Sequence, residues 1–323
     1  MKAAFTSCLD VLDDDVQKVW NHVAAQNPDV LLLLGDSIYM DFGLPGFSDH
    51  PLGRPQKWDL PKFAKEMHGR YKAQSQVPSF RNLVGSVGRV GAIWDDHDFG
   101  WNGASGKGIG WNVMPSEKKS IARGLHMQFR EWLRTRPLPP DYPGQPEMES
   151  LLSGPDVGIE EVFDIDAVRF VMLDGRYYRE EAVVEIDPID GQPERRPEST
   201  SLLGDSQRNW LAEKINEWSG IIVLCSGSTI TGRSDAWEQY LDLSWLKQQR
   251  FQRTVILSGD IHTIASKKHK SLHGLWEFTA SGAARPGFGG DSGNFGILNV
   301  TGDGIEVQLF DEDGLDKTKS VQL

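Results

Sequence analysis

The sequence predicts an α/β fold, in which buried strands alternate with helices and an antiparallel region follows near the end of the chain. Short apolar runs recur between amphipathic helical patterns, and the clearest of them is Val30–Leu34, five apolar residues in succession. Such a run is typical of a strand buried on both faces of a mostly parallel sheet. Apolar runs near the end flank Thr301-Gly302-Asp303-Gly304, which favours a hairpin turn.

The composition limits the classes of function. A chain of 323 residues is long enough for one large domain or two moderate ones. Its 46 acidic and 34 basic residues give a net charge of −12, which disfavours a nucleic-acid scaffold or an anionic membrane as partner. No apolar run reaches the length of a membrane span, and the first residues lack the apolar core of a signal peptide. The sequence therefore predicts a cytoplasmic protein, unless a leader has been removed.

The first half of the chain is expected to contain three strands and three helices. The helices are assigned from apolar residues at helical spacing, as with Val16, Val19, Trp20 and Val23. The expected strands are residues 2–5, 30–34 and 90–94, and the expected helices are residues 13–24, 61–74 and 117–135. Segments rich in glycine or proline predict loops over residues 42–60, 99–114 and 137–155.

The second half begins with an expected hairpin and continues with alternating elements. The hairpin comprises residues 162–165 and 167–173, and a polar surface loop covers residues 180–199. The elements that follow are a helix at 206–218, a strand at 221–225, a helix at 242–250 and a strand at 254–257. The last expected strands are antiparallel and cover residues 276–280, 296–300 and 305–310.

Three of the buried strands end in acidic residues. Asp36 follows Val30–Leu34, Asp96 follows the strand at 90–94, and Asp260 follows the strand at 254–257. Ligands of open α/β sheets bind at the carboxyl ends of the strands, so these side chains are expected to converge there. One aspartate after a strand equally fits a turn cap, but the repetition favours a common site.

Converging carboxylates repel one another, and bound cations relieve that repulsion. One group of candidate ligands is anionic and mixed in softness, which suits a transition metal and ferric iron in particular. Its members are Cys8, Asp36, Tyr39 and His262. A second group offers only oxygen ligands, which suit Ca²⁺, Mg²⁺ or Mn²⁺. Its members are Asp36, Asp96 and Asp260, so Asp36 is the expected bridge.

Such a two-metal site suits hydrolysis of a small phosphate ester, because it activates a water and stabilises the oxygens of an in-line displacement. His97 would protonate the leaving group or stabilise charge, and Arg176 would clamp the phosphoryl group. Each assignment has an alternative. Tyr39 could instead be a buried core residue whose hydroxyl bonds to a backbone carbonyl. Cys8 could be an unreactive thiol of the core, and Arg176 could form a structural ion pair.

A set of short motifs in this chain resembles the PhoD-like family of alkaline phosphatases, which are distant relatives of the calcineurin-like metallophosphoesterases. The motifs are Ser7-Cys8, Gly35-Asp36-Ser37-Ile38-Tyr39, Trp94-Asp95-Asp96-His97-Asp98, Leu173-Asp174-Gly175-Arg176-Tyr177-Tyr178-Arg179 and Ser258-Gly259-Asp260-Ile261-His262. Each motif alone is weak, but the ordered set is specific. The wider superfamily's Asp-x-His, Gly-Asn-His-Glu and Gly-His-x-His motifs do not occur here as such, which agrees with the narrower branch.

The resemblance implies a four-layer α/β/β/α sandwich, and residues 1–323 are expected to form a single catalytic domain. The chain departs from the family in one respect, because the β-sandwich domain that often precedes the catalytic domain has no room before Cys8. The resemblance implies phosphomonoesterase and phosphodiesterase activity with Fe³⁺ and one or two Ca²⁺ ions, while Mn²⁺, Mg²⁺ or Zn²⁺ are the alternative metals. It assigns iron to Cys8, Asp36, Tyr39 and His262, and calcium to Asp36, Asp96 and Asp260. The residues that would meet the phosphate are His97, Asn102 and Arg176.

Two other functions fit parts of the sequence. The first is that of a GDSL-type esterase, because the segment Leu34-Gly35-Asp36-Ser37 imitates its first motif, with Ser37 as the nucleophile. That enzyme class needs an aspartate three residues before a histidine, and none of the eight histidines has one. The second is a non-catalytic, metal-bound scaffold, which the complete ligand set disfavours.

Overall fold

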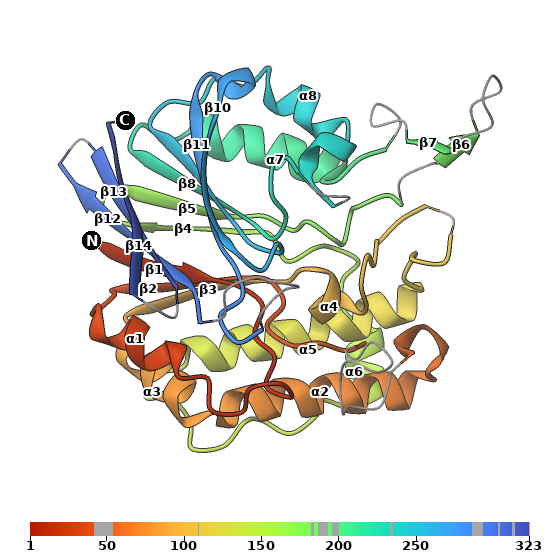
Figure 1. Cartoon of the computed structure of the whole chain (residues 1–323). Coiled ribbons are helices and arrows are strands. Elements are labelled where there is room, and N and C mark those ends of the chain that lie inside the picture. Colours follow the sequence, from red (N-terminus) through yellow and green to blue (C-terminus); the bar gives the residue numbers. More distant parts are fainter. Residues whose placement is uncertain are drawn as a thin grey trace.

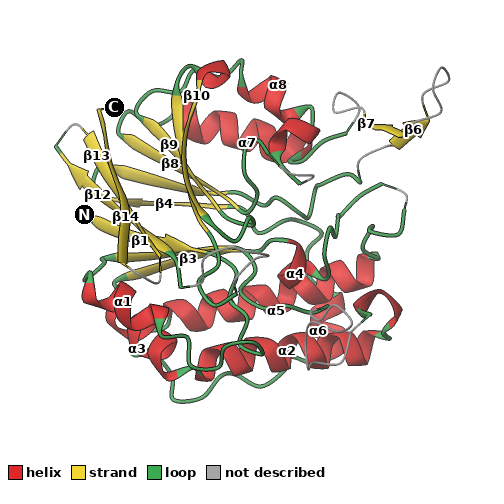
Figure 2. Ribbon diagram, viewed as in Figure 1, coloured by secondary structure: helices red, strands yellow, loops and turns green. Residues whose placement is uncertain are grey.

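The computed structural model describes residues 1–41, 54–108, 110–181, 184–186, 193–195, 200–232, 235–285, 293–302, 304–311 and 314–322. These residues form two six-stranded sheets that pack face to face, with helices on both outer faces (Figure 1). Figure 2 shows the resulting order of layers, from helices through two sheets to helices. The predicted α/β class and the four-layer sandwich that the resemblance implies are both confirmed.

The first sheet has the strand order β14-β13-β12-β1-β2-β3. Its parallel part consists of β1 (Lys2–Thr6), β2 (Val30–Leu34) and β3 (Arg89–Ile93). Its antiparallel part consists of β12 (Phe295–Thr301), β13 (Gly304–Asp311) and β14 (Gly314–Gln322). Every residue of β2 is buried, because the strand lies between the second sheet and the outer helices.

The second sheet has the strand order β10-β11-β9-β8-β5-β4. Its strands are β4 (Glu161–Ile165), β5 (Val168–Met172), β8 (Ile221–Ser226), β9 (Thr254–Ser258), β10 (Ile264–His269) and β11 (Leu275–Ala280). The antiparallel arrangement predicted for residues 276–280 is only partly correct, since β11 runs parallel to β9 and antiparallel to β10. No apolar pattern indicates β10 in the sequence, because Ser266, Lys267 and Lys268 are exposed at this sheet edge.

Helices cover the two sheets unequally (Figure 2). Those outside the first sheet include α1 (Val19–Ala25), α2 (Leu60–Gln76), α3 (Pro78–Ser86) and α5 (Ser116–Arg134). Those outside the second sheet include α7 (Gly204–Asn216) and α8 (Asp242–Leu246). A single turn, α4 (Asp96–Phe99), follows β3 directly. None of the helices in the described ranges combines the length and apolar composition that crossing a membrane requires.

The predicted helix at residues 13–24 is wrong in its first half. The Asp14 side chain accepts hydrogen bonds from the backbone N–H groups of Val16 (3.0 Å) and Gln17 (2.8 Å). Gln17 also has a left-handed backbone, with φ of 44°. This local turn competes with helical hydrogen bonding, so α1 begins only at Val19.

Other boundaries also differ from the prediction. The segment 137–155 contains the short helix α6 (Met148–Leu152), and the segment 180–199 contains the paired strands β6 (Val184–Ile186) and β7 (Pro193–Arg195). The helix predicted for 242–250 ends at Leu246. Of the loop predicted for 42–60, residues 42–53 lie outside the described residues, and Pro55–Lys57 form a 3-10 turn.

Gly91 of β3 lies where the two sheets meet. A Cβ at this position would lie 3.0 Å from Phe163 Cε1 and 3.2 Å from Met172 Cε, and both of these neighbours belong to the second sheet. We expect Gly91→Val to lower the free energy of unfolding by about 1–3 kcal/mol, the usual cost of overpacking a core. Urea unfolding measures this change.

Gly69 supplies the matched control for that substitution. It is exposed in α2, and a Cβ there would meet nothing within 4 Å. Gly69→Ala is therefore expected to raise the free energy of unfolding by roughly 0.5–1 kcal/mol through helix propensity. Equal stability of Gly91→Val and the wild type would contradict the close approach of the sheets at Gly91.

The strands that carry the predicted site belong to both sheets. β2 and β3 are neighbours in the first sheet, whereas β9 lies in the second. The expectation of a single sheet edge is therefore corrected: the residues converge where the ends of two stacked sheets meet. In Figure 1 this end of the sandwich is marked by α4, on the side away from both chain termini.

Candidate metal centre

Two groups of potential metal ligands gather at this end of the sandwich. The first comprises Asp36, Asp96 and His97, and the second comprises Asp95, Asp96 and Asp260. In each group, one ligand atom per residue lies within 4.8 Å of the others. Asp96 is common to both groups, whereas the sequence interpretation gave that place to Asp36. Asp95 was not among the predicted ligands, although it lies next to Asp96 in the chain.

Four predicted ligands have a left-handed backbone, which most residues avoid. The φ angles are 64° at Cys8, 51° at Asp36, 73° at Asp260 and 51° at His262. In the described part of the chain nine residues other than glycine have positive φ, so almost half of them are predicted ligands. Concentrated backbone strain of this kind is a property of functional sites.

Gly35 allows the ends of β2 and β3 to approach each other. Its φ is 101°, and a Cβ there would lie 2.6 Å from Asp95 Cβ. Any other residue would push the Asp36 turn away from the Asp95 turn. Glycine is therefore required at position 35 because a side chain there would collide with the turn after the neighbouring strand.

Cys8, Asp36 and Tyr39 form a compact buried cluster. The Tyr39 hydroxyl donates to Asp36 Oδ2 at 3.3 Å, and the Cys8 thiol lies 3.6 Å from the same oxygen. Burial, more than the neighbouring charges, raises the pKa of all three groups. Three acids packed so closely can ionise together only beside a cation, and a thiol, a phenol and a carboxyl group suit a transition metal.

His262 has the hydrogen bonding of a neutral imidazole. Its Nδ1 lies 2.9 Å from the carbonyl oxygen of Arg285, which can accept a proton but not donate one. Burial lowers the pKa of His262 to about 4. Nδ1 therefore carries the hydrogen, and Nε2 keeps a lone pair for a metal. His262 belongs to neither of the two groups found among the described residues, and its assignment to iron stays a prediction.

The second group contains a buried oxygen that lacks a partner. Asp95 Oδ1 accepts a hydrogen bond from Arg176 Nε at 2.5 Å, while Asp95 Oδ2 is buried without a hydrogen bond in the described structure. Burial first, and then the charges of Asp95 and Asp96, raise the pKa of Asp260. Leaving a buried carboxylate oxygen unsatisfied is costly. An oxygen-binding cation would satisfy it, so these residues fit Ca²⁺, Mg²⁺ or Mn²⁺.

His97 is held by an acidic residue that the sequence interpretation missed. Asp41 Oδ1 lies 2.6 Å from His97 Nδ1, and Asp41 Oδ2 accepts from the backbone N–H of Asn102 at 2.7 Å. Burial lowers the pKa of His97, but Asp41, Asp96 and Asp36 together outweigh it and raise the pKa well above its usual value. The only sequence signal for Asp41 is its position two residues after Tyr39.

The predicted phosphate contacts of Arg176 and Asn102 stay predictions. Arg176 is fully buried, and besides Asp95 its guanidinium contacts Asp235 Oδ2 at 3.2 Å and Asp96 Oδ1 at 3.8 Å. These contacts orient two of the candidate ligands. The Asn102 side chain is exposed beside the centre.

Ser37 lacks the base that a serine nucleophile needs, as far as the described residues show. Its hydroxyl is buried without a hydrogen bond among them, and its backbone N–H donates to Asp98 Oδ2 at 2.9 Å. Asp98 also accepts from the backbone N–H of Asp95 at 2.6 Å, so it caps α4. The esterase alternative requires a histidine bonded to Ser37, and no described histidine is.

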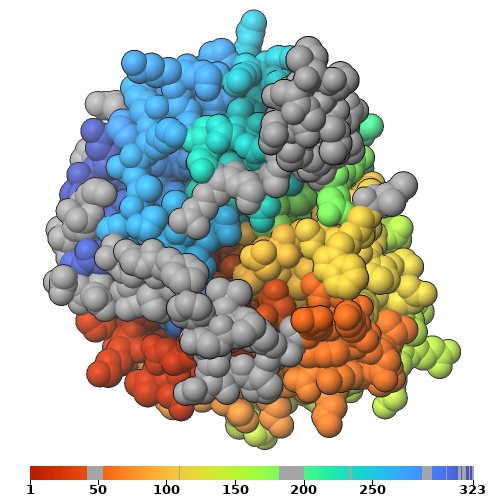
Figure 3. Space-filling model, turned by 45° about the vertical axis from the view of Figure 1, so that its right-hand side comes forward, coloured from red at the N-terminus to blue at the C-terminus, as the bar shows by residue number. Residues whose placement is uncertain are grey.

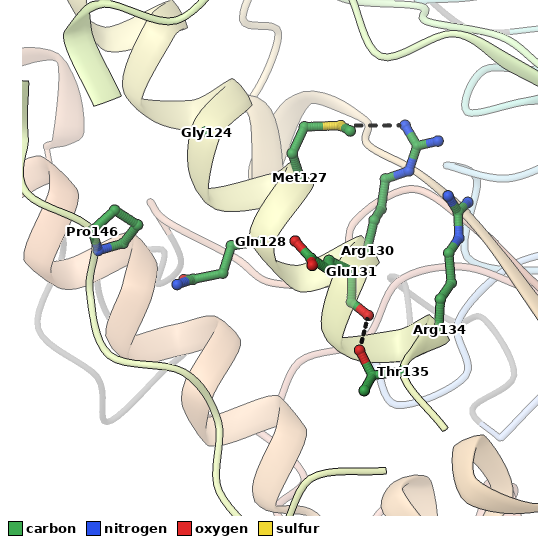
Figure 4. A pocket seen from close by; sticks show the side chains of 8 residues that line it. All are labelled: Gly124, Met127, Gln128, Arg130, Glu131, Arg134, Thr135 and Pro146. Atoms are coloured by element: carbon green, nitrogen blue, oxygen red, sulfur yellow. Dashed lines mark hydrogen bonds between the residues drawn. The ribbon is translucent and has the colours of Figure 1, made fainter. Parts of the chain in front are cut away.

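One cavity of about 570 Å³ lies on α5, and none of the candidate ligands lines it (Figure 4). Its two arginines, Arg130 and Arg134, both pair with Glu161. This cavity is therefore distinct from the candidate metal centre.

In Figure 3 the gold segment that follows α4 lies beside the cyan and blue segments of the second half of the chain.

The chain is similar to known proteins in both sequence and fold. The family described as PhoD-like phosphatase matches residues 3–309. A solved structure titled "Structure of PhoD" aligns with 18% identity and a TM-score of 0.65, covering 100% of this chain and 72% of that one. This likeness shows a shared fold.

Two further structures align more weakly. TT1561 of Thermus thermophilus has 9% identity and a TM-score of 0.42, with 99% of this chain and 98% of that chain covered. The phosphoesterase Yfce from E. coli has 11% identity and a TM-score of 0.38, with the same two coverages of 99% and 98%. No curated protein matches the chain. Because the family match spans nearly all of its 323 residues, the chain belongs to the PhoD-like phosphatase family.

Proposed function

We propose that this protein hydrolyses small phosphate esters, both monoesters and diesters, at a centre of ferric iron and calcium. Family membership supports metal-dependent phosphoester hydrolysis as its reaction class. The choice of metals rests on one observation: Cys8 Sγ and Tyr39 Oη both contact Asp36 Oδ2. A thiolate and a phenolate together favour iron over calcium.

The donor sets divide between the two kinds of metal. Cys8, Asp36, Tyr39 and His262 would hold Fe³⁺, and Asp36, Asp96 and Asp260 would hold one or two Ca²⁺ ions. Asp95 Oδ2, which is buried without a hydrogen bond among the described residues, would be a further ligand for calcium. Mn²⁺, Mg²⁺ or Zn²⁺ are the alternatives. When bound, the metals supply an activated water and neutralise the phosphoryl oxygens.

His97 is the proposed general acid. Asp41 occupies its Nδ1 atom, so the proton available to the leaving-group oxygen is the one on Nε2. The charge of Asp41 raises the pKa of His97 and so favours its protonated form. Arg176 would hold Asp95 and Asp96 in place and face the phosphate with its remaining N–H groups, and the exposed Asn102 amide would bind a phosphoryl oxygen.

Elemental analysis of the purified protein, with a visible spectrum of the same sample, tests the choice of metals. We expect about one iron and at least about one calcium per chain, with a phenolate-to-iron absorption band. Tyr39→Phe should remove that band. Tyr71→Phe is the matched control and should keep it, because the buried Tyr71 hydroxyl bonds to His126 Nδ1 at 3.1 Å instead.

Other outcomes would separate the alternatives. A band that survives Tyr39→Phe excludes Tyr39 as a ligand. Two zinc or manganese ions and a colourless protein would keep the phosphoesterase and remove the proposed roles of Cys8 and Tyr39. A protein that holds metals and cleaves neither phosphate monoesters nor diesters would be the scaffold.

A further inference from the structure

One segment contacts three of the four proposed iron ligands. Residues 281–285 follow β11, and their backbone N–H groups bond to the end of β1: Ala284 donates to the carbonyl oxygen of Cys8 at 3.2 Å. Ser281 Oγ lies 3.1 Å from Cys8 Sγ and accepts from the His262 N–H at 3.0 Å. The carbonyl oxygen of Arg285 accepts from His262 Nδ1 at 2.9 Å.

The side chain of Arg285 reaches the third ligand. Its guanidinium carbon lies 4.2 Å from the centroid of the Tyr39 ring, which places a cation over the aromatic ring. Arg285 Nη1 donates to Asp10 Oδ2 at 2.5 Å, and Asp10 is itself buried and accepts from the Leu12 N–H at 3.0 Å. The guanidinium is thus anchored at one end while it covers Tyr39 at the other.

We propose that Arg285 is a positioning residue of the iron site, fixing the Tyr39 ring with its guanidinium and the His262 ring with its carbonyl oxygen. This inference rests on the proposed function, because it assumes that Tyr39 binds iron. A guanidinium over an aromatic ring attracts the ring electrons, and the attraction is stronger for a phenolate than for a phenol. Partners behind metal ligands both orient those ligands and tune the metal.

This role has a spectroscopic consequence. A cation over the phenolate lowers the energy of its donor electrons, so their transfer to iron requires more energy. Loss of the Arg285 charge should therefore move the phenolate-to-iron band to longer wavelength. A looser Tyr39 ring should also release iron faster, by roughly tenfold, at the lower end of the effects known for residues behind metal ligands.

The experiment compares Arg285→Gln with the wild type, both purified with iron. The visible spectrum gives the band position, and a chelator added in excess gives the rate of iron loss. Arg285→Lys keeps a cation and should give intermediate values. Asp10→Asn releases the anchor without touching Tyr39 and should shift both readouts in the same direction as Arg285→Gln.

Arg70 provides the matched control. Its guanidinium donates to the backbone carbonyl oxygen of Tyr39, so Arg70→Gln removes a neighbouring cation that does not cover the ring. We expect the band to stay in place in that variant. Circular dichroism of each variant checks that it has folded.

The outcomes distinguish this role from the proposed function. A band that depends on Tyr39, but whose position and iron-loss rate are unchanged in Arg285→Gln and Asp10→Asn, overturns the role of Arg285 and leaves the iron site standing. A wild-type protein without a Tyr39-dependent band overturns the iron site and the role of Arg285 with it.

Discussion

Replacing Asp96 by asparagine is expected to abolish hydrolysis and to lower the calcium content. Asp96 is the residue that the two ligand groups share, so the substitution removes a negative charge from both at once. We expect kcat/KM to fall by more than about 10³-fold, beyond the loss that follows removal of a single electrostatic donor. Elemental analysis and steady-state kinetics on the same preparation measure both effects.

Asp36→Asn tests whether Asp36 or Asp96 is the ligand shared by the two metals. The sequence makes Asp36 the bridge and predicts the loss of both metals. Asp36 lies in only one of the two groups among the described residues, so loss of iron alone, with calcium retained at Asp95, Asp96 and Asp260, would make Asp96 the shared ligand in place of Asp36. Asp164→Asn is a control in an exposed ion pair with Arg169 and should leave both metals in place. Full retention of both metals in Asp96→Asn would exclude it as the shared ligand.

His97→Gln is expected to lower kcat by about 10²–10⁴-fold on an alkyl phosphate, the range that general acids contribute. The loss should be much smaller on p-nitrophenyl phosphate, whose leaving group needs no proton. Metal content should not change if His97 is the acid. Loss of metal would instead make His97 a ligand beside Asp36 and Asp96. Comparing kcat for the two substrates in the wild type and the variant measures the effect.

Asp41 makes this prediction sharper. Asp41→Asn should reproduce part of the loss, and the double variant should be no worse than His97→Gln alone, since Asp41 acts through His97. His22→Gln, at an exposed position in α1, should leave both substrates unaffected. Equal losses on the two substrates in His97→Gln would show that the histidine does not protonate the leaving group.

Local sequence patterns were sufficient to predict the strands and turns that carry the candidate ligands. Val30–Leu34 was predicted as a strand because all five residues are apolar, and it is buried throughout. The turns after β2, β3 and β9 were recognisable because each places an acidic residue within three positions of the end of an apolar run. The strand β10 was missed for the opposite reason, as its central residues are exposed and polar.

The partners of the site residues could not be predicted in this way. Asp41 and His97 are 56 residues apart, and Arg285 and Asp10 are 275 residues apart. No periodicity links such positions, because side-chain spacing along an element informs only about neighbours on that element. The sequence predicted Arg176 as a site residue from its position after a strand and from the family resemblance, but its complete burial beside Asp95 and Asp235 is a property of the packed structure.

The sequence by itself determined the fold class, the family and the identity of most candidate ligands, because each ligand follows a strand whose apolar run is local and readable. Only the tertiary structure decided that both sheets contribute to the site and that Asp96 belongs to both ligand groups. It also decided that Asp41 contacts His97 and that Arg285 contacts the Tyr39 ring. The physical reason is that coordination and hydrogen bonding depend on distances of a few ångströms in space. Those distances are set by how the two sheets pack, and packing joins residues that are remote in the chain.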